Sequence, residues 1–299
     1  ADAYERACGQ YFPKILCGVP FTPVTGPRLM AAPHAGDHEN DIRGALCAAM
    51  VKIANRLELS SIHINFSTKP EWDLMGEMGF LLRQGQQFHW ENNGYATFDD
   101  FLASLSSRKR KNIKKERARI SDTGLDIRAL TSDEITEGHW DAFYKFYRNT
   151  SDRKWGSAYL NRRFFSMIGE RCKDSVVLIY AEADGLPVAG ALNFAGSDTL
   201  FGRNWGCAAQ FKFLHFEACY YQAMDYAIAH GLKRVEAGAQ GPHKIQRGYL
   251  PSATFSAHWI ADEWFRDAVE RFLGEERQGV AYEMELNAEH SPFRKGEEN

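Results

Sequence analysis

Hydrophobic and polar residues follow helical and strand spacings in turn along the first part of the chain. Apolar residues recur at helical spacing from Glu39 to Leu57, which predicts an amphipathic helix. Ser61 to Phe66 alternates as a strand does, and Glu71 to Met78 returns to a short helical pattern. Phe80 to Trp90 predicts two strands on either side of Gly85. We therefore expect helix, strand, helix and strands in this order.

A second series of elements is predicted from residue 125 onward. Strand patterns occupy Leu125–Leu130, Ser175–Glu182, Pro187–Phe194 and Thr199–Gly206. Helical patterns occupy Trp140–Tyr147, Arg162–Ile168, Leu214–His230 and Trp264–Val280. The Asp184-Gly185 pair predicts a hairpin turn. We expect the tail beyond Asn287 to be disordered.

Composition limits the functional classes. The chain has 299 residues, 44% hydrophobic and 25% charged, so it has the character of a globular protein with room for two cores. The net charge of −3 argues against a DNA-binding protein, although a basic patch can still be local. No run approaches the roughly 18 apolar residues of a transmembrane segment. No signal peptide is recognised, and the start at Ala1 resembles the middle of a domain, so we expect residues to be missing upstream.

The six cysteines form no C-x-x-C pair and no other metal-ligand spacing. The sequence therefore predicts neither a metal site nor a disulfide framework. Such cysteine usage fits a reducing, cytoplasmic location best.

Polar residues are densest between Arg234 and Pro251, a stretch that begins with a short strand pattern and contains three glycines. It follows a helical pattern that Gly231 closes as a C-cap. The polar loop thus leaves the carboxyl end of a strand, where α/β sheets place their chemistry. A solvated surface loop is the alternative interpretation. The polar residues of the loop are Glu236, Gln240, His243, Lys244, Arg247 and Tyr249.

A basic segment precedes the second series of elements. Arg108–Arg119 contains eight basic residues and one acidic residue, and Ser106 or Ser107 is a suitable N-cap for a helix there. Nucleic acid, a coenzyme's phosphates and an anionic membrane surface all suit such a segment, and a solvated linker helix is the alternative. The candidates for phosphate or donor contacts are Arg108, Arg110, Lys111 and Lys115.

Two further segments contain candidate substrate contacts. Tyr11 to Leu29 is rich in proline and suits edge strands and turns, and Arg28 near its end is a candidate either for an anionic ligand or for a surface ion pair. Asn149 to Asn161 is polar and loop-like, and we expect it near the substrate cleft unless it is a solvated connection. Its candidate residues are Asp152, Arg153, Lys154 and Trp155.

Several strings resemble those of known acyltransferases. The run S-S-R-K-R-K-N-I-K-K, the hairpin A-x-x-D-G-x-P-V-A-G and the string A-H-G-L-K-R-V-E-A-G resemble the second acyltransferase domain of the FemAB/FemX-type ligases. Over its whole length the chain is similar to the FemAB-like family of predicted N-acyltransferases. The strings of that family stand here at Pro20–Arg28, Asp152–Leu160, Leu214–Gln222 and Glu236–Tyr249.

The resemblance implies a mixed α/β fold of two tandem GNAT-like acyltransferase domains, with mainly antiparallel sheets flanked by helices. It implies an N-terminal domain over 1–98 that lacks its opening strands, a basic helical connection over 99–123 and a C-terminal domain over 124–299. It also implies an N-acyltransferase that moves an acyl or aminoacyl group to a small-molecule or lipid amine, in the biosynthesis of peptidoglycan or lipid of the cell envelope.

One departure from the superfamily concerns the donor. Acyl-CoA enzymes of this superfamily usually bind pyrophosphate with a Q/R-x-x-G-x-G/A turn at the start of the long helix. Gly206–Phe213 reads GCAAQFKF here. We therefore expect no tightly bound cofactor, and an acyl carrier protein or an aminoacyl-tRNA stands beside acyl-CoA as the donor co-substrate. The basic segment suits either of these two partners.

Acyl transfer to an amine needs a base, donors for the oxyanion and an acid for the leaving group. Glu236 and His243 are the candidate bases, and Tyr249 is the candidate acid. His215 and Glu217 turn to different sides of a helix, so we expect one of them to be structural. The expected contacts with the substrate or oxyanion come from Arg203, Asn204, Trp205, His215, Glu217, Gln240, Lys244 and Arg247.

The acceptor is open among a peptidoglycan peptide, an amino sugar, a lipid amine and a free amino acid. The contrasting class is a non-catalytic recognition module that holds a cell-wall or lipid headgroup, with peripheral contact to a membrane. The fold alone does not separate the two classes, because one fold supports many activities.

Overall fold

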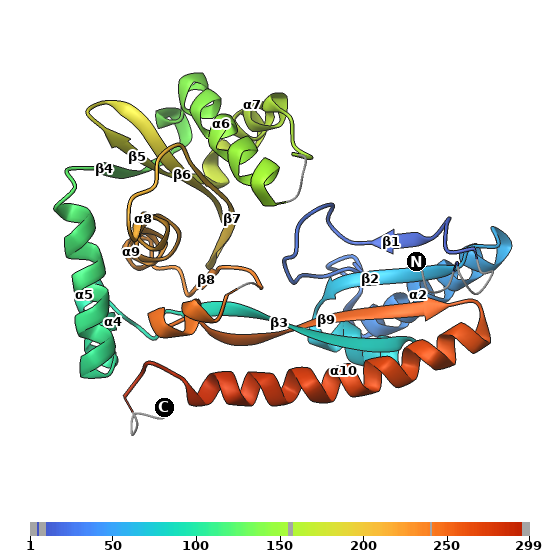
Figure 1. Ribbon diagram of the computed structural model, residues 1–299. Coiled ribbons are helices and arrows are strands. Elements are labelled where there is room, and N and C mark those ends of the chain that lie inside the picture. Colours follow the sequence, from blue (N-terminus) through green and yellow to red (C-terminus); the bar gives the residue numbers. More distant parts are fainter. Residues whose placement is uncertain (1–4, 6–9, 155–157, 240, 295–299) are drawn as a thin grey trace. The chain divides into compact units, whose positions relative to one another are not determined.

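The computed structural model describes residues 5, 10–154, 158–239 and 241–294 (Figure 1). The chain divides into two compact units: unit 1 comprises Ala1–Gln86 and Ser252–Leu286, and unit 2 comprises Gln87–Pro251 and Asn287–Asn299. We expected a boundary near residue 98 and an undivided domain after residue 124. The chain returns to unit 1 after residue 251 because strand β9 (Leu250–Ile260) pairs with β2 (Ser61–Ser67).

Unit 1 is built on strands β1 (Ile15–Cys17), β2 and β9. Strand β1 is parallel to β2, and β2 is antiparallel to β9. The core of this unit includes Ile62 and Ile64 from β2. The patterns predicted for residues 39–78 are confirmed. The helices of this unit are η1 (Gly36–His38), α2 (Glu39–Arg56), α3 (Lys69–Glu77) and most of α10 (Glu263–Glu289).

Unit 2 has the strand order β3-β8-β7-β6-β5-β4. Its strands are β3 (Leu81–Glu91), which begins in unit 1, β4 (Asp126–Thr131), β5 (Val176–Ala183), β6 (Leu186–Ala195), β7 (Thr199–Cys207) and β8 (Arg234–Glu236). Only the β7–β8 pair is parallel among these described pairings.

The helical segments of unit 2 are numerous and short for the most part. They are α4 (Phe98–Ser104), α5 (Ser107–Ser121), η2 (Ser132–Glu134), α6 (Glu137–Lys154), α7 (Arg162–Arg171), η3 (Lys173–Ser175), α8 (Leu214–Phe216), η4 (Glu217–Tyr221), α9 (Gln222–Ala229) and η5 (Pro242–Arg247).

Helices cover both faces of the unit 2 strands (Figure 1). The side chains of β5 alternate between the two faces of the sheet. Val177 and Ile179 belong to the core around α9. Leu178 and Tyr180 belong to the core formed with α6 and α7. Successive side chains of a strand point to opposite faces, so the apolar run of β5 is explained by burial on both sides.

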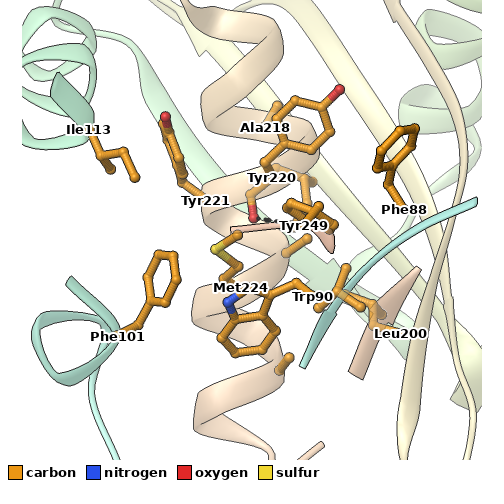
Figure 2. Packing of buried hydrophobic residues seen from close by; sticks show 14 of the residues in the cluster. Phe88, Trp90, Phe101, Ile113, Leu200, Ala218, Tyr220, Tyr221, Met224 and Tyr249 are labelled. Carbon is orange, nitrogen blue, oxygen red and sulfur yellow. Dashed lines mark hydrogen bonds between the residues drawn. The ribbon is translucent and has the colours of Figure 1, made fainter. Parts of the chain in front are cut away.

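The core around α9 is rich in aromatic side chains. Figure 2 shows Trp90 of β3, Phe101 of α4 and Tyr221 of η4 packed around the helical segment that contains Met224. Tyr249 lies in the same cluster and is fully buried. This packing fixes the helical segment against β7 and β8, where the polar loop begins.

Three elements differ in extent from the prediction. Residues Leu81–Glu91 form one strand, not two, and an added Cβ on Gly85 would lie 3.0 Å from Thr254 Oγ1. This glycine therefore marks a close approach, not a turn. Helix α6 continues to Lys154 through part of the expected loop, and α10 continues to Glu289 through the start of the expected disordered tail.

The helix predicted from Leu214 to His230 is confirmed over Leu214–Ala229, but it contains a π-helical turn at η4. π-helical turns are rare and are frequent at functional sites. Gly231 follows with a φ of 65°, as expected for a C-cap. The strand β9 was not predicted.

Substitution of Gly206 tests the close contact between α6 and β7. An added Cβ on Gly206 would lie 2.3 Å from Phe146 O, a backbone atom that cannot move alone. We expect Gly206→Ala to lower the free energy of unfolding, measured with urea, by about 2 kcal/mol or more, because overpacking a rigid site is costly.

Gly138→Ala in α6 is the matched control, since its nearest neighbour would be Thr136 Oγ1 at 3.5 Å. It should change the unfolding free energy by less than about 1 kcal/mol, in the stabilising direction. Equal stability of the two variants would contradict the close packing at Gly206.

Candidate functional site

A pocket opens where β7 and β8 separate. The two strands pair in parallel over only three positions, Thr199 with Arg234, Leu200 with Val235 and Phe201 with Glu236. Strand β8 then ends, whereas β7 continues beside β6 to residue 207. The pocket beyond this point has a volume of about 480 Å³.

Several predicted residues line this pocket together. They come from β7, the start of the helical segment and η5: Arg203, Asn204, Trp205, His215, His243 and Lys244. The polar loop and the strand bearing Arg203 therefore meet, as the sequence predicted. Whether these residues act in catalysis or binding stays a prediction.

His243 and Tyr220 form the central polar contact of the pocket. The Tyr220 hydroxyl lies 3.0 Å from His243 Nε2, and the ring of His215 packs near both. Burial, Arg247 and Lys244 lower the pKa of His243 below its usual 6.5. Burial raises the pKa of Tyr220. At neutral pH the imidazole is therefore an unprotonated base next to a protonated phenol.

Lys244 fixes the loop that forms one wall of the pocket. Its buried Nζ donates hydrogen bonds to the carbonyl oxygens of Ala237 at 2.5 Å and Gly238 at 3.1 Å. Burial lowers the pKa of this lysine to about 8. Most of its charge is thus retained at neutral pH, close to the end of β8.

Arg247 lies behind the pocket and not in it. Its Nε and Nη2 donate to the two carboxylate oxygens of Glu116 at 3.1 and 2.7 Å, and its Nη1 donates to His243 O at 2.8 Å. The guanidinium also stacks on the ring of Phe216, 3.4 Å from the ring centre. The predicted substrate contact of Arg247 is not supported, because its guanidinium holds η5 and does not line the pocket.

Glu236 does not line the pocket. It is buried, with its Oε2 3.8 Å from His89 Nε2 and its Oε1 4.0 Å from Arg234 Nη1. Burial raises its pKa to about 7, against the lowering effect of Arg234. Val235 and Ala237 point the other way, and Ala237 lines the pocket. The candidate base in the pocket is therefore His243.

Tyr249 and Glu217 are also directed away from the pocket. Tyr249 is fully buried and its hydroxyl donates to Tyr220 O at 3.4 Å. Burial raises its pKa well above 10. Glu217 accepts hydrogen bonds from Arg117 Nη2 at 3.0 Å and Gln222 Nε2 at 2.8 Å. We expected one of His215 and Glu217 to be structural, and in the structure that residue is Glu217.

Arg28 belongs to unit 1 and binds its own loop. Its guanidinium donates to the carbonyl oxygens of Asn65, Pro27 and Val24 at 2.9, 3.2 and 2.7 Å. The buried Glu71 accepts its backbone N–H at 2.8 Å. The expected binding of an anionic ligand is not supported, because these carbonyls already hold the group.

The segment after α6 approaches the pocket through Tyr159, whose hydroxyl accepts a hydrogen bond from Arg203 Nη2 at 3.1 Å. Asp152 pairs with Arg148 at 3.6 Å, and Arg153 donates to Asn149 O at 3.1 Å, so neither is directed to the pocket lining. The Lys154 side chain, Trp155 and Gln240 lie outside the described residues.

The basic segment forms helix α5, with two different sides. On the inner side Ile113 and Ile120 are buried, and Arg117 Nη2 pairs with Glu217 and Asp225 at 3.0 and 2.6 Å. On the outer side Arg108, Lys111 and Lys115 are exposed, whereas Arg110 is half-buried nearer the inner side. None of these four has an ion pair with a described residue. The segment is thus part of unit 2, and its phosphate-binding role stays a prediction.

Three pocket residues with polar or reactive side chains were missed, Asn193, Cys219 and Tyr220. Asn193 interrupts the apolar run of β6, which was a usable signal, and its amide donates to Ala191 O at 3.1 Å. Cys219 and Tyr220 follow His215 by about one helical turn, and both line the pocket from the π-helical turn η4. Within residues 10–154, 158–239 and 241–294, no cluster suited to a metal ion and no helix able to cross a membrane is found.

Solved structures of other proteins share this fold. FemX aligns with 85% of each chain covered, 12% identity and a TM-score of 0.57. L-PGS from Bacillus licheniformis aligns over 78% of this chain and 79% of its own, with 10% identity and a TM-score of 0.57. These similarities confirm the predicted fold class, a mixed α/β fold with two GNAT-like units.

The chain itself belongs to the FemAB-like family, described by the words peptidoglycan biosynthesis/recognition, whose model matches residues 1–295. This confirms the resemblance inferred from the strings. No curated protein matches the chain in sequence.

The Glu116–Arg247 pair predicts a strong coupling in stability. The two side chains are only 15% and 9% exposed, so removing one leaves the other charge buried without its partner. We expect Glu116→Ala to cost about 3 kcal/mol of unfolding free energy, and the double variant Glu116→Met/Arg247→Met to cost less than the sum of its single changes.

Lys114→Ala is the control, because its ion pair with Asp99 is exposed and should contribute less than about 1 kcal/mol. Additive effects of the two buried changes in a urea-denaturation cycle would show that the pair does not hold η5.

Proposed function

We propose that the chain is an N-acyltransferase that moves an acyl or aminoacyl group from a thioester or a charged tRNA to an amine, in the biosynthesis of peptidoglycan or lipid of the cell envelope. The observation that supports this most is the contact between His243 and Tyr220 in an open pocket at the separation of β7 and β8. The peptidoglycan description of the family supports the cell-envelope role.

The chemistry follows from the groups in the pocket. The acceptor nitrogen attacks the carbonyl carbon of the donor, a C–N bond forms, and the imidazole of His243 accepts the proton that the nitrogen loses. Tyr220 orients the imidazole through its hydroxyl. The bond from carbon to sulfur or oxygen then breaks, and the leaving group takes the proton from the imidazolium.

Two side chains of β7 serve the reacting carbonyl and amine. Arg203 lines the pocket and supplies positive charge for the oxyanion that forms at the carbonyl. Asn204 Oδ1 is buried and has no hydrogen-bond partner in the described part of the chain, so it is suited to accept an N–H of the acceptor amine. Positioning of the two reactants supplies much of the rate enhancement.

The outer side of α5 suits the donor. Its exposed basic residues follow one another at helical spacing, and no large hydrophobic side chain of α5 is exposed. A phosphate backbone is bound by charge alone, whereas a protein partner usually needs an apolar centre. This favours a donor that carries phosphate groups, either a charged tRNA or a CoA thioester, over an acyl carrier protein. Glu116 links the inner side of α5 to Arg247 and hence to His243.

The second candidate is a recognition module without turnover. The solvent access of the pocket is compatible with a bound cell-wall or lipid headgroup, and Tyr220, Asn193 and Asn204 would then serve only in binding. Only a measurement of transfer separates this candidate from an enzyme.

The acid–base role of His243 predicts a large loss of rate on substitution. With a panel of acyl thioesters, charged tRNA and amines, followed by mass spectrometry, His243→Ala should lower kcat by about 10²- to 10⁴-fold. His230→Ala is the matched control, because His230 stacks on Tyr226 away from the pocket and should leave kcat unchanged.

The rate should also depend on pH in a defined direction. A lowered pKa means that the imidazole loses its proton at a lower pH, so the rate should rise with pH below 6.5 and level off near neutrality. Unchanged turnover in His243→Ala would remove this residue as the base. Tight headgroup binding with no transfer from any donor would favour the recognition module.

A further inference from the structure

Two side chains that line the pocket, Arg203 and Lys244, are cations at neutral pH, whereas His243 is uncharged there. Arg203, His215, His243 and Lys244 line it, and no aspartate or glutamate of the described residues does so. Cysteine and tyrosine complete the titratable groups there, and both are uncharged when protonated. The pocket is therefore basic although the chain as a whole has a net charge of −3.

The carboxylates nearest in sequence are turned away. Glu236, at the end of β8, is directed to His89 and Arg234. Glu217, two residues after His215, is bound to Arg117 of α5. Neither lines the pocket, so no acid among the described lining residues opposes its positive charge.

Burial strengthens this potential. Lys244 is only 4% exposed, and its Nζ is held by two carbonyl oxygens near the pocket wall. Charges that water screens poorly act more strongly on a ligand than surface charges do. Arg203 is held by the Tyr159 hydroxyl and lines the same pocket. A bound group thus meets two basic side chains in fixed positions.

We infer that the group bound in this pocket carries a negative charge, as a carboxylate or a phosphate, and that a group ending in an ammonium is disfavoured. The inference rests on the proposed function where it concerns the acyl group: it favours an acyl chain with an anionic end over an aminoacyl group. The volume of about 480 Å³ suits a short chain of this kind.

The same electrostatics help the acceptor. A basic pocket favours the neutral form of an amine over its ammonium, so it lowers the pKa of an acceptor that enters beside Arg203. A neutral amine is the form that attacks a carbonyl. The charge of the pocket therefore acts in the same direction on binding of the acyl group and on activation of the acceptor.

Three amides of equal length test the inference by binding alone. Succinamate, butanamide and β-alaninamide differ only in an end that is anionic, neutral or cationic. Calorimetric titration of the intact chain at pH 7 should give at least about tenfold tighter binding for succinamate than for butanamide, with β-alaninamide weakest, since tenfold corresponds to one modest charge interaction. Added salt should weaken only the succinamate complex.

Inorganic phosphate distinguishes the source of the charge. Displacement of succinamate by phosphate at lower concentration would support the same basic site with a phosphate of the donor as its ligand. Tighter binding of succinamate than of phosphate would support a carboxylate on the acyl chain. Equal or tighter binding of β-alaninamide would overturn the inference, and so would equal affinity for all three amides.

Variants locate the binding in the pocket. Arg203→Gln should reduce succinamate affinity about tenfold and leave butanamide unchanged, and Arg203→Lys should recover most of the loss. Lys173→Gln is the matched control, because Lys173 pairs with Asp133 and does not line the pocket. Unchanged succinamate affinity in a folded Arg203→Gln would overturn the assignment.

These results are independent of turnover. Selective succinamate binding without any acyl transfer would refute the proposed transferase and leave this inference standing. Transfer of an aminoacyl group, with no preference for anionic amides in the titrations, would support the transferase and refute this inference.

Discussion

The short parallel pairing between β7 and β8 is the constraint on which the functional part of the structure depends. Only three residue pairs join the strands, and after Phe201 and Glu236 they separate. Gly202 permits the last close approach, since an added Cβ would lie 3.1 Å from Glu236 O. Lys244 then holds the carbonyl groups that follow β8, so the gap stays open and polar. The pocket is a consequence of where hydrogen bonding between two strands stops.

A layer of buried and half-buried ion pairs supports this gap from behind. Arg247 connects Glu116 of α5 to His243 O, and Arg117 connects Glu217 to Asp225. Charges that looked functional in the sequence thus divide into two groups. The side chains of one group hold helices together through ion pairs. The other group, which includes Arg203 and His243, lines the pocket. The exposed basic side of α5 remains available for a partner, which fits the donor role proposed for it.

Much of the fold could be predicted from the sequence because spacing reports burial directly. The alternation in β2 indicates burial on one face, and the apolar run of β5 indicates burial on both faces. The strings shared with the family indicated the tandem arrangement. Strand β9 escaped prediction because Leu250–Ile260 mixes small, polar and aromatic residues without a clear period. Its pairing with β2 over nearly two hundred residues of sequence is a tertiary effect that local patterns do not contain.

The site was predicted less completely, for a different reason. The sequence identified the loop and β7, but the face to which a strand residue points depends on where that strand lies, so Glu236 was taken as a base although it faces His89. Tyr249 was taken as an acid, whereas Tyr220 makes the contact with His243. Tyr220 lies in a π-helical turn, and no single residue of the segment signals such a turn.

The central claim is that acyl transfer takes place where β7 and β8 separate. The most direct measurement is a crystal structure of the protein with S-acetonyl pantetheine, a ketone that resembles a thioester but does not react. We expect the ketone oxygen within about 3 Å of Arg203, with the carbonyl carbon beside His243. An ordered ketone elsewhere on the chain, with the pocket between β7 and β8 empty, would contradict it.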